Sequence, residues 1–509
     1  MSIFSCAPVF SDHMVLQRGK NINVWGIGSD GSEVEVSLNG KTVRTAVKNH
    51  KWFAVLPPME AGGAYEMTVS SHGETITFSD VMIGEVWLAG GQSNMELELQ
   101  NSLDGKNVVK NIGSVNVRFY YTKKNAFMDD FFYADERDSC WCKASPETAS
   151  CQSAVGYYFA KKLSEDLGVA VGIIGCNWGG TSASAWISRE MLSSDRDTKS
   201  YVDEYDAAMS GKSFEQYCDE LDDYNAYTEQ WQPKINEFYR NNPNGEWGDA
   251  LAFAGPCRYP EPLGPKSPFR AGGLYETMLK RVAPYTLAGF IYYQGESDDH
   301  KPNIYCKLLK MLIEQWRSDW NDDEMPFIFV QLPMHINRGE EDRKNWCLIR
   351  EAQMRVHKTV ANTGIAVALD CGEYGNIHPL DKRPVGERLE LQALCHVYHK
   401  ISEDKAYGAI YSSALNDGSD IVISFDYSKG GFEVRGERAV GFEVAGSDKK
   451  YFPANAVFEG ERIRLSSEQV EKPEYARYNW VNYGEVTVFS KNGLPLAPFR
   501  TSRNDGFRI

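Results

Sequence analysis

The sequence lacks a long apolar segment. No uninterrupted apolar run in its 509 residues approaches the roughly 18 residues that a helix needs to span a bilayer. The first 16 residues include Asp12 and His13 and have no apolar core, which is not the pattern of a secretory signal. We therefore expect no membrane partner, and we favour a cytoplasmic location unless a leader has been removed from the chain.

Basic residues and paired cysteines are also scarce. The chain has 54 Lys and Arg against 70 Asp and Glu, a formal net charge of −16, and so acidic a protein repels phosphate backbones. Its 11 cysteines are scattered and form no Cys-x-x-Cys pair of the kind that binds zinc. We expect no nucleic-acid partner, no metal and no cofactor. Mostly buried free thiols suit a reducing compartment.

Residues 1–80 have the pattern of a small β domain. Apolar and polar residues alternate over 34–38 and again over 42–47, and Asn39-Gly40 between them is a hairpin signal. Further short strands are predicted over 52–56, 65–69 and 75–78. Regularly spaced short strands with Gly and Asn turns favour a β-sandwich.

From residue 81 to 404 the pattern is typical of an α/β domain. Continuous apolar runs, as expected for strands buried on both faces of a parallel sheet, recur along this region. They cover 86–89, 168–175, 287–293, 327–332 and 364–369. Helical stretches such as 155–167 and 302–316 separate them. The alternation predicts a parallel sheet whose active site lies at the C-terminal strand ends.

An insertion at about 190–275 interrupts this alternation. Its acidic, aromatic part over 201–239 is predicted to be helical, and its Pro- and Gly-rich part over 243–268 is predicted to be loop. We expect the insertion to roof the active site. Strand patterns return over 405–509, which predicts a third, β-rich domain.

The segment Gly91-Gln92-Ser93-Asn94-Met95 follows the first apolar run directly. A serine at the end of a buried strand points its hydroxyl into the crevice where ligands bind, and its backbone N–H can stabilise a developing negative charge. The same position also suits an ordinary helix-capping serine.

Two further segments follow strands of the predicted sheet. Gly179-Gly180 ends the segment after the run at 168–175, and adjacent glycines let a backbone N–H approach a ligand closely. Gln294 follows the run at 287–293, where a side-chain amide can donate to an oxyanion. A plain turn and a polar surface loop are the simpler interpretations of these two segments.

His378, in Asn376-Ile377-His378-Pro379, follows the last predicted strand. It is placed to meet Ser93 across the strand ends, and such pairs are normally close in space rather than in sequence. Four such segments, in this order and each after its own strand, are much more specific together than any one of them.

These segments resemble the SGNH hydrolase superfamily and, within it, the sialate O-acetylesterase-like carbohydrate esterases. The matching strings are 84–87, 91–95, 178–181 with Trp186, 293–297, and 377–379 with Lys382 and 386–389. Further matches at 10–17, 477–480 and 498–500 extend the resemblance over nearly the whole chain. The insertion is the part that it supports least.

The resemblance implies an SGNH (flavodoxin-like) parallel sheet with helices on both faces, flanked by N- and C-terminal β-sandwich-like domains. It implies a serine esterase that removes O-acetyl groups from an acetylated carbohydrate. Ser93 would attack the ester carbonyl, and His378 would take the proton and return it to the leaving hydroxyl. The N–H groups of Ser93 and Gly180 and the amide of Gln294 would form the oxyanion hole.

One position departs from the family pattern. The superfamily usually carries an aspartate two or three residues before the histidine, where this chain has Asn376 and Gly375. An amide brings no negative charge to stabilise the imidazolium. Either a Ser93–His378 dyad suffices, or another carboxylate such as Asp370 or Glu373 substitutes, or the protein is weakly active. We favour Asp370, because it ends the strand that leads to His378.

The substrate has two candidates. The resemblance favours an O-acetylated sialic acid, whose carboxylate calls for an arginine fork, and Arg270, Arg383 and Arg388 lie near the motif segments. The acidic net charge favours a neutral acetylated polysaccharide such as xylan. A third hypothesis is a non-catalytic carbohydrate-binding protein that keeps the fold and has Asn376 in an inactive site.

Overall fold

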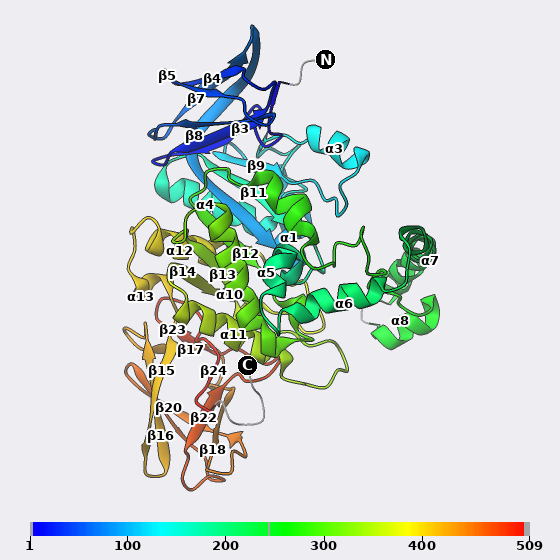
Figure 1. Cartoon of the computed structure of the whole chain (residues 1–509). Helices are drawn as coiled ribbons and strands as arrows, with labels where there is room; N and C mark the ends of the chain where they lie inside the picture. The colour runs from blue at the N-terminus through cyan, green and yellow to red at the C-terminus, as the bar shows by residue number, and fades with distance from the viewer. Residues whose placement is uncertain (1–3, 243–244, 503–509) are drawn as a thin grey trace.

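The computed structural model of the chain describes residues 4–242 and 245–502. Figure 1 shows a β-rich region at each end of the molecule and an α/β body between them. The prediction of an α/β region followed by a β-rich C-terminal region is confirmed. Within the described residues, no helix has both the length and the apolar character needed to cross a membrane.

The body is built on a mixed sheet whose main path has the strand order β10-β9-β11-β8-β12-β13-β14. These strands are β8 (Glu74–Gly91), β9 (Val117–Tyr121), β10 (Cys142–Lys143), β11 (Val171–Asn177), β12 (Gly289–Tyr293), β13 (Phe327–Gln331) and β14 (Thr363–Val367). All neighbours pair in parallel except β10, which is antiparallel at the edge. The chain goes to one side of β8 for β11 and to the other side for β12. The strand order therefore reverses at β8, and ligands of such sheets bind at the strand ends beside this reversal.

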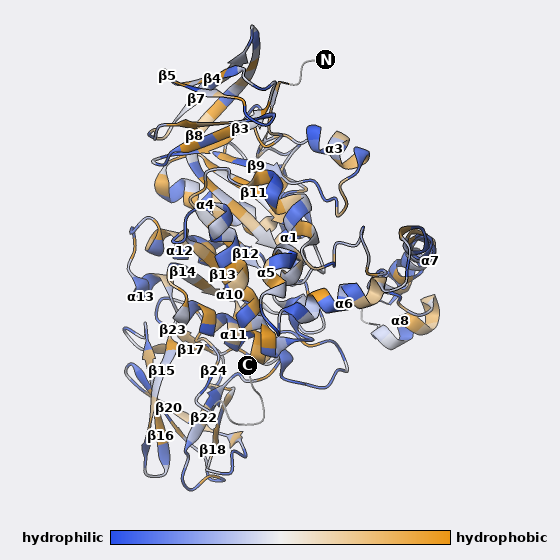
Figure 2. Ribbon diagram, in the orientation of Figure 1, coloured by the Kyte–Doolittle hydropathy of each residue, from blue (hydrophilic) through white to orange (hydrophobic). Residues whose placement is uncertain are grey.

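Helices cover the sheet because its strands are apolar on both faces; every residue of β11, β12, β13 and β14 is buried. Helices α4 (Ala154–Leu167) and α12 (Arg383–His396) pack together, and α10 (Pro302–Asp319) and α11 (Asn345–Thr359) form the other pair (Figure 1). Figure 2 shows hydrophobic residues gathered in the central strands. This packing fixes the strand ends that carry the motif segments.

The N-terminal region shares a strand with the body. β8 has 18 residues; its first half pairs antiparallel with β7 (Gly62–Ser71), and its second half lies in the central sheet. The other strands are β1 (Ser5–Cys6), β2 (Val15–Gln17), β3 (Ile22–Ile27), β4 (Glu33–Leu38), β5 (Lys41–Ala46) and β6 (Lys51–Leu56). The Asn39-Gly40 turn joins β4 and β5 as predicted.

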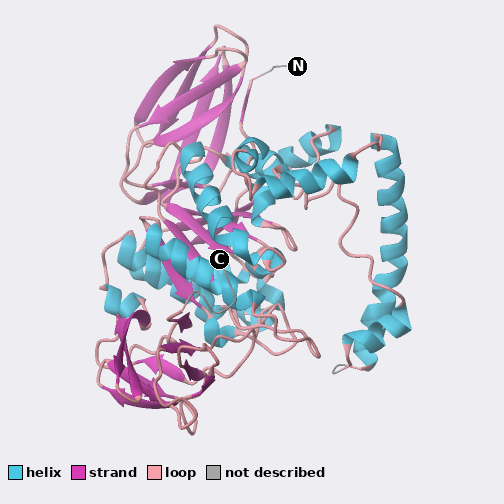
Figure 3. Ribbon diagram, turned by 60° about the horizontal axis from the view of Figure 1, so that its bottom comes forward, coloured by secondary structure: helices cyan, strands magenta, loops and turns pink. Residues whose placement is uncertain are grey.

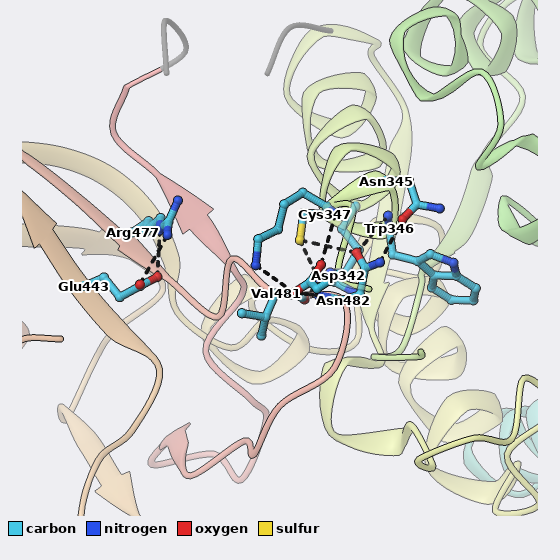
Figure 4. Close-up of polar contacts among 10 residues, drawn as sticks. Asp342, Asn345, Trp346, Cys347, Glu443, Arg477, Val481 and Asn482 are labelled. Carbon is cyan, nitrogen blue, oxygen red and sulfur yellow. Dashed lines mark hydrogen bonds and ion pairs between the residues drawn. The ribbon is translucent and has the colours of Figure 1, made fainter. Parts of the chain in front are cut away.

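The C-terminal region consists of two four-stranded sheets and one strand pair. Its strands are β15 (Ile410–Asp417), β16 (Asp420–Asp426), β17 (Phe432–Val434), β18 (Phe442–Ala445), β19 (Phe452–Pro453), β20 (Asn455–Glu459), β21 (Arg462–Ser466), β22 (Tyr475–Tyr478), β23 (Val488–Ser490) and β24 (Phe499–Arg500). Figure 4 shows how Asn482 of this region meets α11: its Oδ1 accepts from the Trp346 N–H at 3.2 Å, and its Nδ2 donates to Asn345 Oδ1 at 2.7 Å. The Asn482 carbonyl also accepts from the His335 N–H at 2.9 Å.

The insertion forms the helices α5 (Arg189–Ser193), α6 (Lys199–Met209), α7 (Phe214–Asn241) and α8 (Trp247–Ala254). The prediction of loop over 243–268 is wrong for α8, whose apolar side chains pack on α7; residues 243–244 lie outside the described part of the chain. Figures 1 and 3 show α7 and α8 standing away from the sheet, so these helices do not roof the strand ends. We call α6, α7 and α8 the arm.

Short helical segments complete the chain. They are α1 (Ser93–Glu96), α2 (Gly105–Lys110), α3 (Asp130–Arg137), α9 (Lys280–Val282), α13 (Glu403–Ala406), a π-helical turn at Tyr275–Leu279, and 3-10 turns at Leu99–Asn101, Ala183–Trp186, Glu296–Asp298 and Leu369–Cys371.

Candidate active site

Ser93 lies where the sheet reverses its strand order. β8 ends at Gly91, and α1 begins at Ser93. Gly91 has a φ of 134°, and a Cβ at this position would collide with the carbonyl oxygen of Tyr293. Only glycine fits so close to the neighbouring strand. The turn that it permits takes the chain out of the sheet and leaves Ser93 half-buried at the strand ends.

His378 meets Ser93 across the strand ends, although 285 residues separate them in the sequence. His378 Nε2 lies 2.7 Å from Ser93 Oγ. Burial lowers the pKa of His378, and the Lys382 ammonium and His335 lower it further, while Glu96 opposes them. A lowered pKa keeps the imidazole neutral, which is the form that accepts a proton from a serine hydroxyl.

The residues expected to orient the imidazole do not contact it. Asn376 Oδ1 accepts from the backbone N–H of His378 at 3.0 Å, and Asn376 Nδ2 donates to Glu373 Oε2 at 2.7 Å. Within residues 4–242 and 245–502, no carboxylate oxygen lies within 4.0 Å of a His378 ring nitrogen.

Our preference for Asp370 as the substitute acid needs correction. Its two oxygens accept from Arg388 at 2.6 and 2.8 Å, and this bidentate pair holds the carboxylate on α12. The strand before His378 does end near Asp370, but the guanidinium competes for the carboxylate more strongly than a neutral ring can. The structure therefore brings Ser93 and His378 together without Asp370.

Two backbone N–H groups lie beside the pair. Gly180 adopts a φ of 76°, and a Cβ on the preceding Gly179 would lie 3.3 Å from Ser93 Cβ. The Gly179 N–H donates to Glu96 Oε2 at 2.5 Å. In the described part of the chain, no acceptor binds the N–H of Gly180 or of Ser93. These two donors are therefore open to a ligand.

Gln294 is buried and its amide is already engaged. Its Nε2 donates to Asp298 Oδ2 at 2.6 Å and, more weakly, to the Thr181 carbonyl at 3.4 Å. Its Oε1 accepts from the Tyr305 hydroxyl at 3.0 Å. The structure thus fixes Gln294 next to the segment that contains Gly180, with no donor pointing free, and its place in an oxyanion hole stays a prediction.

Two aromatic side chains from the end of the insertion reach the strand ends. A Cβ on Gly180 would collide with the Tyr259 hydroxyl and lie 3.2 Å from Phe269 Cε1. The two rings pack edge to face with 5.6 Å between their centroids. This pair forms a wall over Gly180. The wall comes from the loop that follows α8, and not from the arm helices.

The sequence interpretation missed several buried polar residues around the pair. Asn94, Glu296 and Lys382 form a hydrogen-bonded cluster behind it, and Asp298 accepts four hydrogen bonds from Ser182, Ala183, Tyr201 and Gln294. One signal in the sequence could have found some of them: they are charged residues within or beside motif strings that follow buried strands. Among the described residues, no group of three or more His, Cys, Asp or Glu side chains is placed to hold a metal ion.

Comparisons with known proteins identify the kind of enzyme. A family model described as carbohydrate esterase, sialic acid-specific acetylesterase, matches residues 266–386. The sialate O-acetylesterase of Mus musculus is 27% identical, covering 78% of this chain and 74% of that protein. The human sialate O-acetylesterase is 25% identical, covering 78% and 71%. The crystal structure of a carbohydrate acetylesterase from Xanthomonas citri is 27% identical with a TM-score of 0.78, covering 98% of this chain and 99% of that one.

A serine and a histidine in contact at the ends of parallel strands are typical of ester hydrolases, and together with these relatives they define the class: the chain is a carboxylic ester hydrolase. Within that class it is similar to the sialate O-acetylesterases and to the carbohydrate acetylesterase. The resemblance found in the motif strings is confirmed.

Proposed function

We propose that this chain hydrolyses O-acetyl esters of carbohydrates, with Ser93 as nucleophile and His378 as general base. The observation that carries the proposal is the 2.7 Å contact between Ser93 Oγ and His378 Nε2 at the reversal point of the sheet. The carbohydrate esterase family and the acetylesterase relatives support the acetylated carbohydrate as substrate.

The reaction runs in two matched halves. Ser93 Oγ attacks the acetyl carbonyl carbon while His378 Nε2 takes the hydroxyl proton, and the charge that collects on the carbonyl oxygen meets the N–H groups of Ser93 and Gly180. His378 returns the proton to the sugar oxygen as the C–O bond breaks, which leaves acetyl-Ser93. A water molecule, deprotonated by His378, then releases acetate by the same steps.

The remaining predicted residues take supporting roles in this proposal. Gln294 supplies the third oxyanion donor if the N–H held weakly on Thr181 turns to the substrate. Asn376 holds the His378 backbone, and Asp370 holds Arg388. Catalysis then rests on a Ser93–His378 dyad.

We also propose that the body has the SGNH fold. Leaving out the edge strand β10 and its neighbour β9, the parallel order β11-β8-β12-β13-β14 is the 2-1-3-4-5 order of flavodoxin-like sheets, with helices on both faces. A division into 1–80, 81–404 with the insertion at about 190–275, and 405–509, the outer two domains being β-sandwich-like, is part of this proposal. The shared strand β8 would make the first boundary a rigid one.

The choice of sugar depends on the arginines. Arg388 is bound to Asp370, and Arg383 is exposed with its guanidinium 5.3 Å from the Tyr158 ring centroid. Arg270 makes one long hydrogen bond, to the Ala126 carbonyl at 3.3 Å, and its buried Nε has no partner among the described residues. Arg270 is therefore our candidate for a sialate carboxylate, and a neutral acetylated polysaccharide is the alternative if it plays no part.

Acetate release from acetylated sialosides, xylo-oligosaccharides and pectin tests the proposal. Ser93→Ala should abolish release from the preferred substrate, because the hydroxyl forms the acetyl-enzyme. Ser29→Ala, at an exposed serine of the N-terminal region, is the matched control and should keep the wild-type rate. More than a tenth of the wild-type kcat in clean Ser93→Ala protein would remove Ser93 as nucleophile. A selective loss on sialosides in Arg270→Ala would favour the sialate assignment.

A further inference from the structure

Three polar side chains are buried together behind Ser93 and His378. Asn94 lies on α1, Glu296 in the turn after β12, and Lys382 directly before α12. Their exposed fractions are 0%, 5% and 1%. Burial takes the acid and the base out of water, and this desolvation is unfavourable for each ion, so such a pair calls for a reason.

Asn94 is the centre of this cluster. Its Nδ2 donates to Glu296 Oε1 at 2.6 Å and to the Ile377 carbonyl at 2.9 Å, and its Oδ1 accepts from Lys382 Nζ at 2.5 Å. Asn94 follows Ser93 in the chain, and Ile377 precedes His378. One side-chain amide therefore ties the backbone on the nucleophile's side to the backbone on the base's side.

From this geometry we propose that the Asn94–Glu296–Lys382 cluster is the positioning device of the dyad. It holds the His378 loop against α1 in a site where no carboxylate of the described residues orients the imidazole. The inference rests on the proposed function, because it takes Ser93 and His378 as the reacting pair. All three are positioning residues, since they act through the Asn94 amide and the Ile377 carbonyl.

The charges explain why this amide is held firmly. Hydrogen bonds with one ionised partner are roughly twice as strong as neutral ones, and Asn94 has an acid on its N–H₂ and an ammonium on its oxygen. Burial raises the pKa of Glu296 and lowers the pKa of Lys382 to about 8. The groups that act on Lys382 against burial are Glu296, Cys371, Glu373 and Asp381.

Lys382 also acts on the base directly. Its ammonium lowers the pKa of His378, and it lies 5.4 Å from the centroid of the Tyr293 ring. Loss of this charge therefore has two separable consequences: the loop that carries His378 is released, and the imidazole becomes easier to protonate.

Lys382→Met tests the proposal, because methionine fills a similar space without charge. We expect kcat on an aryl acetate to fall about 10²-fold with little change in KM, the size of effect that a displacement of about 1 Å produces. The matched control is Arg383→Met, which removes the exposed cation next in sequence and should stay within about twofold of wild type, as an exposed charge normally does.

The pH profile separates this role from simple packing. In Lys382→Met, the acid limb of kcat/KM should move to higher pH because the imidazole has lost a neighbouring positive charge. Glu296→Gln keeps an acceptor for Asn94 and should cost less than Lys382→Met. The double variant should be no slower than Lys382→Met alone, because both changes act on one amide.

Several outcomes would overturn the inference. Wild-type kcat with an unmoved acid limb in folded Lys382→Met protein would do so, as would an equal loss in Arg383→Met. If Lys382→Met fails to fold, Glu296→Gln and Asn94→Ala measure the same coupling, and full activity in both would overturn it. An inactive Ser93→Ala beside a fully active Lys382→Met refutes the positioning role alone. An active Ser93→Ala refutes the proposed function and this inference together.

Discussion

The strand ends around Ser93 and the arm use polar residues in opposite ways. At the strand ends polar side chains are buried and bound across long sequence separations; Asp298, for example, accepts from Ser182 at 2.6 Å and from Gln294 at 2.6 Å. On the arm the charged side chains face solvent; Asp223 of α7, for example, pairs with Arg258 of the loop after α8 at 2.9 Å, and both side chains are well exposed. Exposed pairs of this kind contribute at most about 1 kcal/mol.

The apolar cores of the two regions also differ, because the arm is packed separately from the rest of the molecule. The arm has a small core of its own, formed by Trp231, Ile235, Phe238, Ala250 and Ala254, separate from the main core of the molecule. Its helix α6 reaches the site network through the Tyr201 hydroxyl, which donates to Asp298 at 2.8 Å. Changes at the strand ends should therefore spread through the site, whereas changes at the tip of the arm should stay local.

Gln294→Ala should give the largest effect in this comparison. It removes a buried amide held by Asp298, Thr181 and Tyr305, and as an oxyanion donor it should lower kcat by about 10²–10³ with a smaller change in KM. Steady-state kinetics on an aryl acetate measure the split. Gln232→Ala, at an exposed glutamine of the arm, is the control and should leave both constants unchanged. A loss confined to KM would assign Gln294 to substrate binding.

The strand ends were the more predictable of the two regions. Each motif follows a strand whose C-terminal part is buried, and such strands stand out in the sequence as apolar runs, so the sequence places Ser93 and His378 at strand ends. The orientation of side chains around them was not predictable in this way. Asp370 follows the strand that leads to His378, yet its carboxylate binds Arg388 of α12. The hydrophobic periodicity of the sequence does not reveal that Arg388 competes with His378 for this carboxylate.

The arm was less predictable, because its packing partners lie inside the insertion itself. The Pro and Gly around residues 243–268 favoured a loop, but the apolar residues of α8 find a partner face on α7, and tertiary packing overrides the local signal. In the same way Tyr259 looks like one more loop aromatic in the sequence, and only the folded chain places it over Gly180.

Asn376→Asp sharpens the question of the missing acid. Asn376 faces the His378 backbone N–H and Glu373, so the substitution sets a carboxylate against the Glu373 carboxylate and away from the imidazole. Like charges in such contact repel, and we expect kcat on an aryl acetate to fall several-fold, up to about tenfold, where a vacant triad position would give a gain. A rise in kcat would show that the position can serve the imidazole after all.

Asp370→Asn is the companion variant. It breaks the bidentate pair with Arg388 and should lower the free energy of unfolding by about 3–5 kcal/mol while the folded protein keeps a near wild-type kcat. Denaturant unfolding and kinetics on the same preparation measure both quantities. A severe loss of kcat at unchanged stability would restore Asp370 to the catalytic group.

Tyr259→Ala tests whether the insertion affects the site through the Tyr259 ring. Removing this ring opens the wall over Gly180, so kcat/KM for an aryl butyrate relative to the acetate should rise about tenfold, the discrimination that a methylene or two supplies in a tight pocket. The acetate rate itself should change by less than about threefold. Tyr133→Ala, at an exposed tyrosine of α3, serves as the control. An unchanged butyrate-to-acetate ratio would show that Tyr259 does not limit the space that the acyl group occupies.

Trp231→Ala should have the smallest effect on activity, although it removes the largest side chain of the arm's own core. Trp231 is 8% exposed and donates from Nε1 to the Gly255 carbonyl at 2.9 Å. A buried Trp→Ala change costs about 3–5 kcal/mol, enough to open a small separate core, so hydrogen exchange in α7 and α8 should quicken while the sheet stays protected. Because the catalytic pair is held by the strand ends, kcat on an aryl acetate should remain within about twofold of wild type, the range expected for distant, independent sites.

Trp247→Ala, at a half-exposed tryptophan whose ring meets Trp231 edge on, should leave exchange nearly unchanged. If kcat falls tenfold with the loosened arm, the two regions are mechanically coupled through the loop that carries Tyr259, and the contrast drawn between them fails.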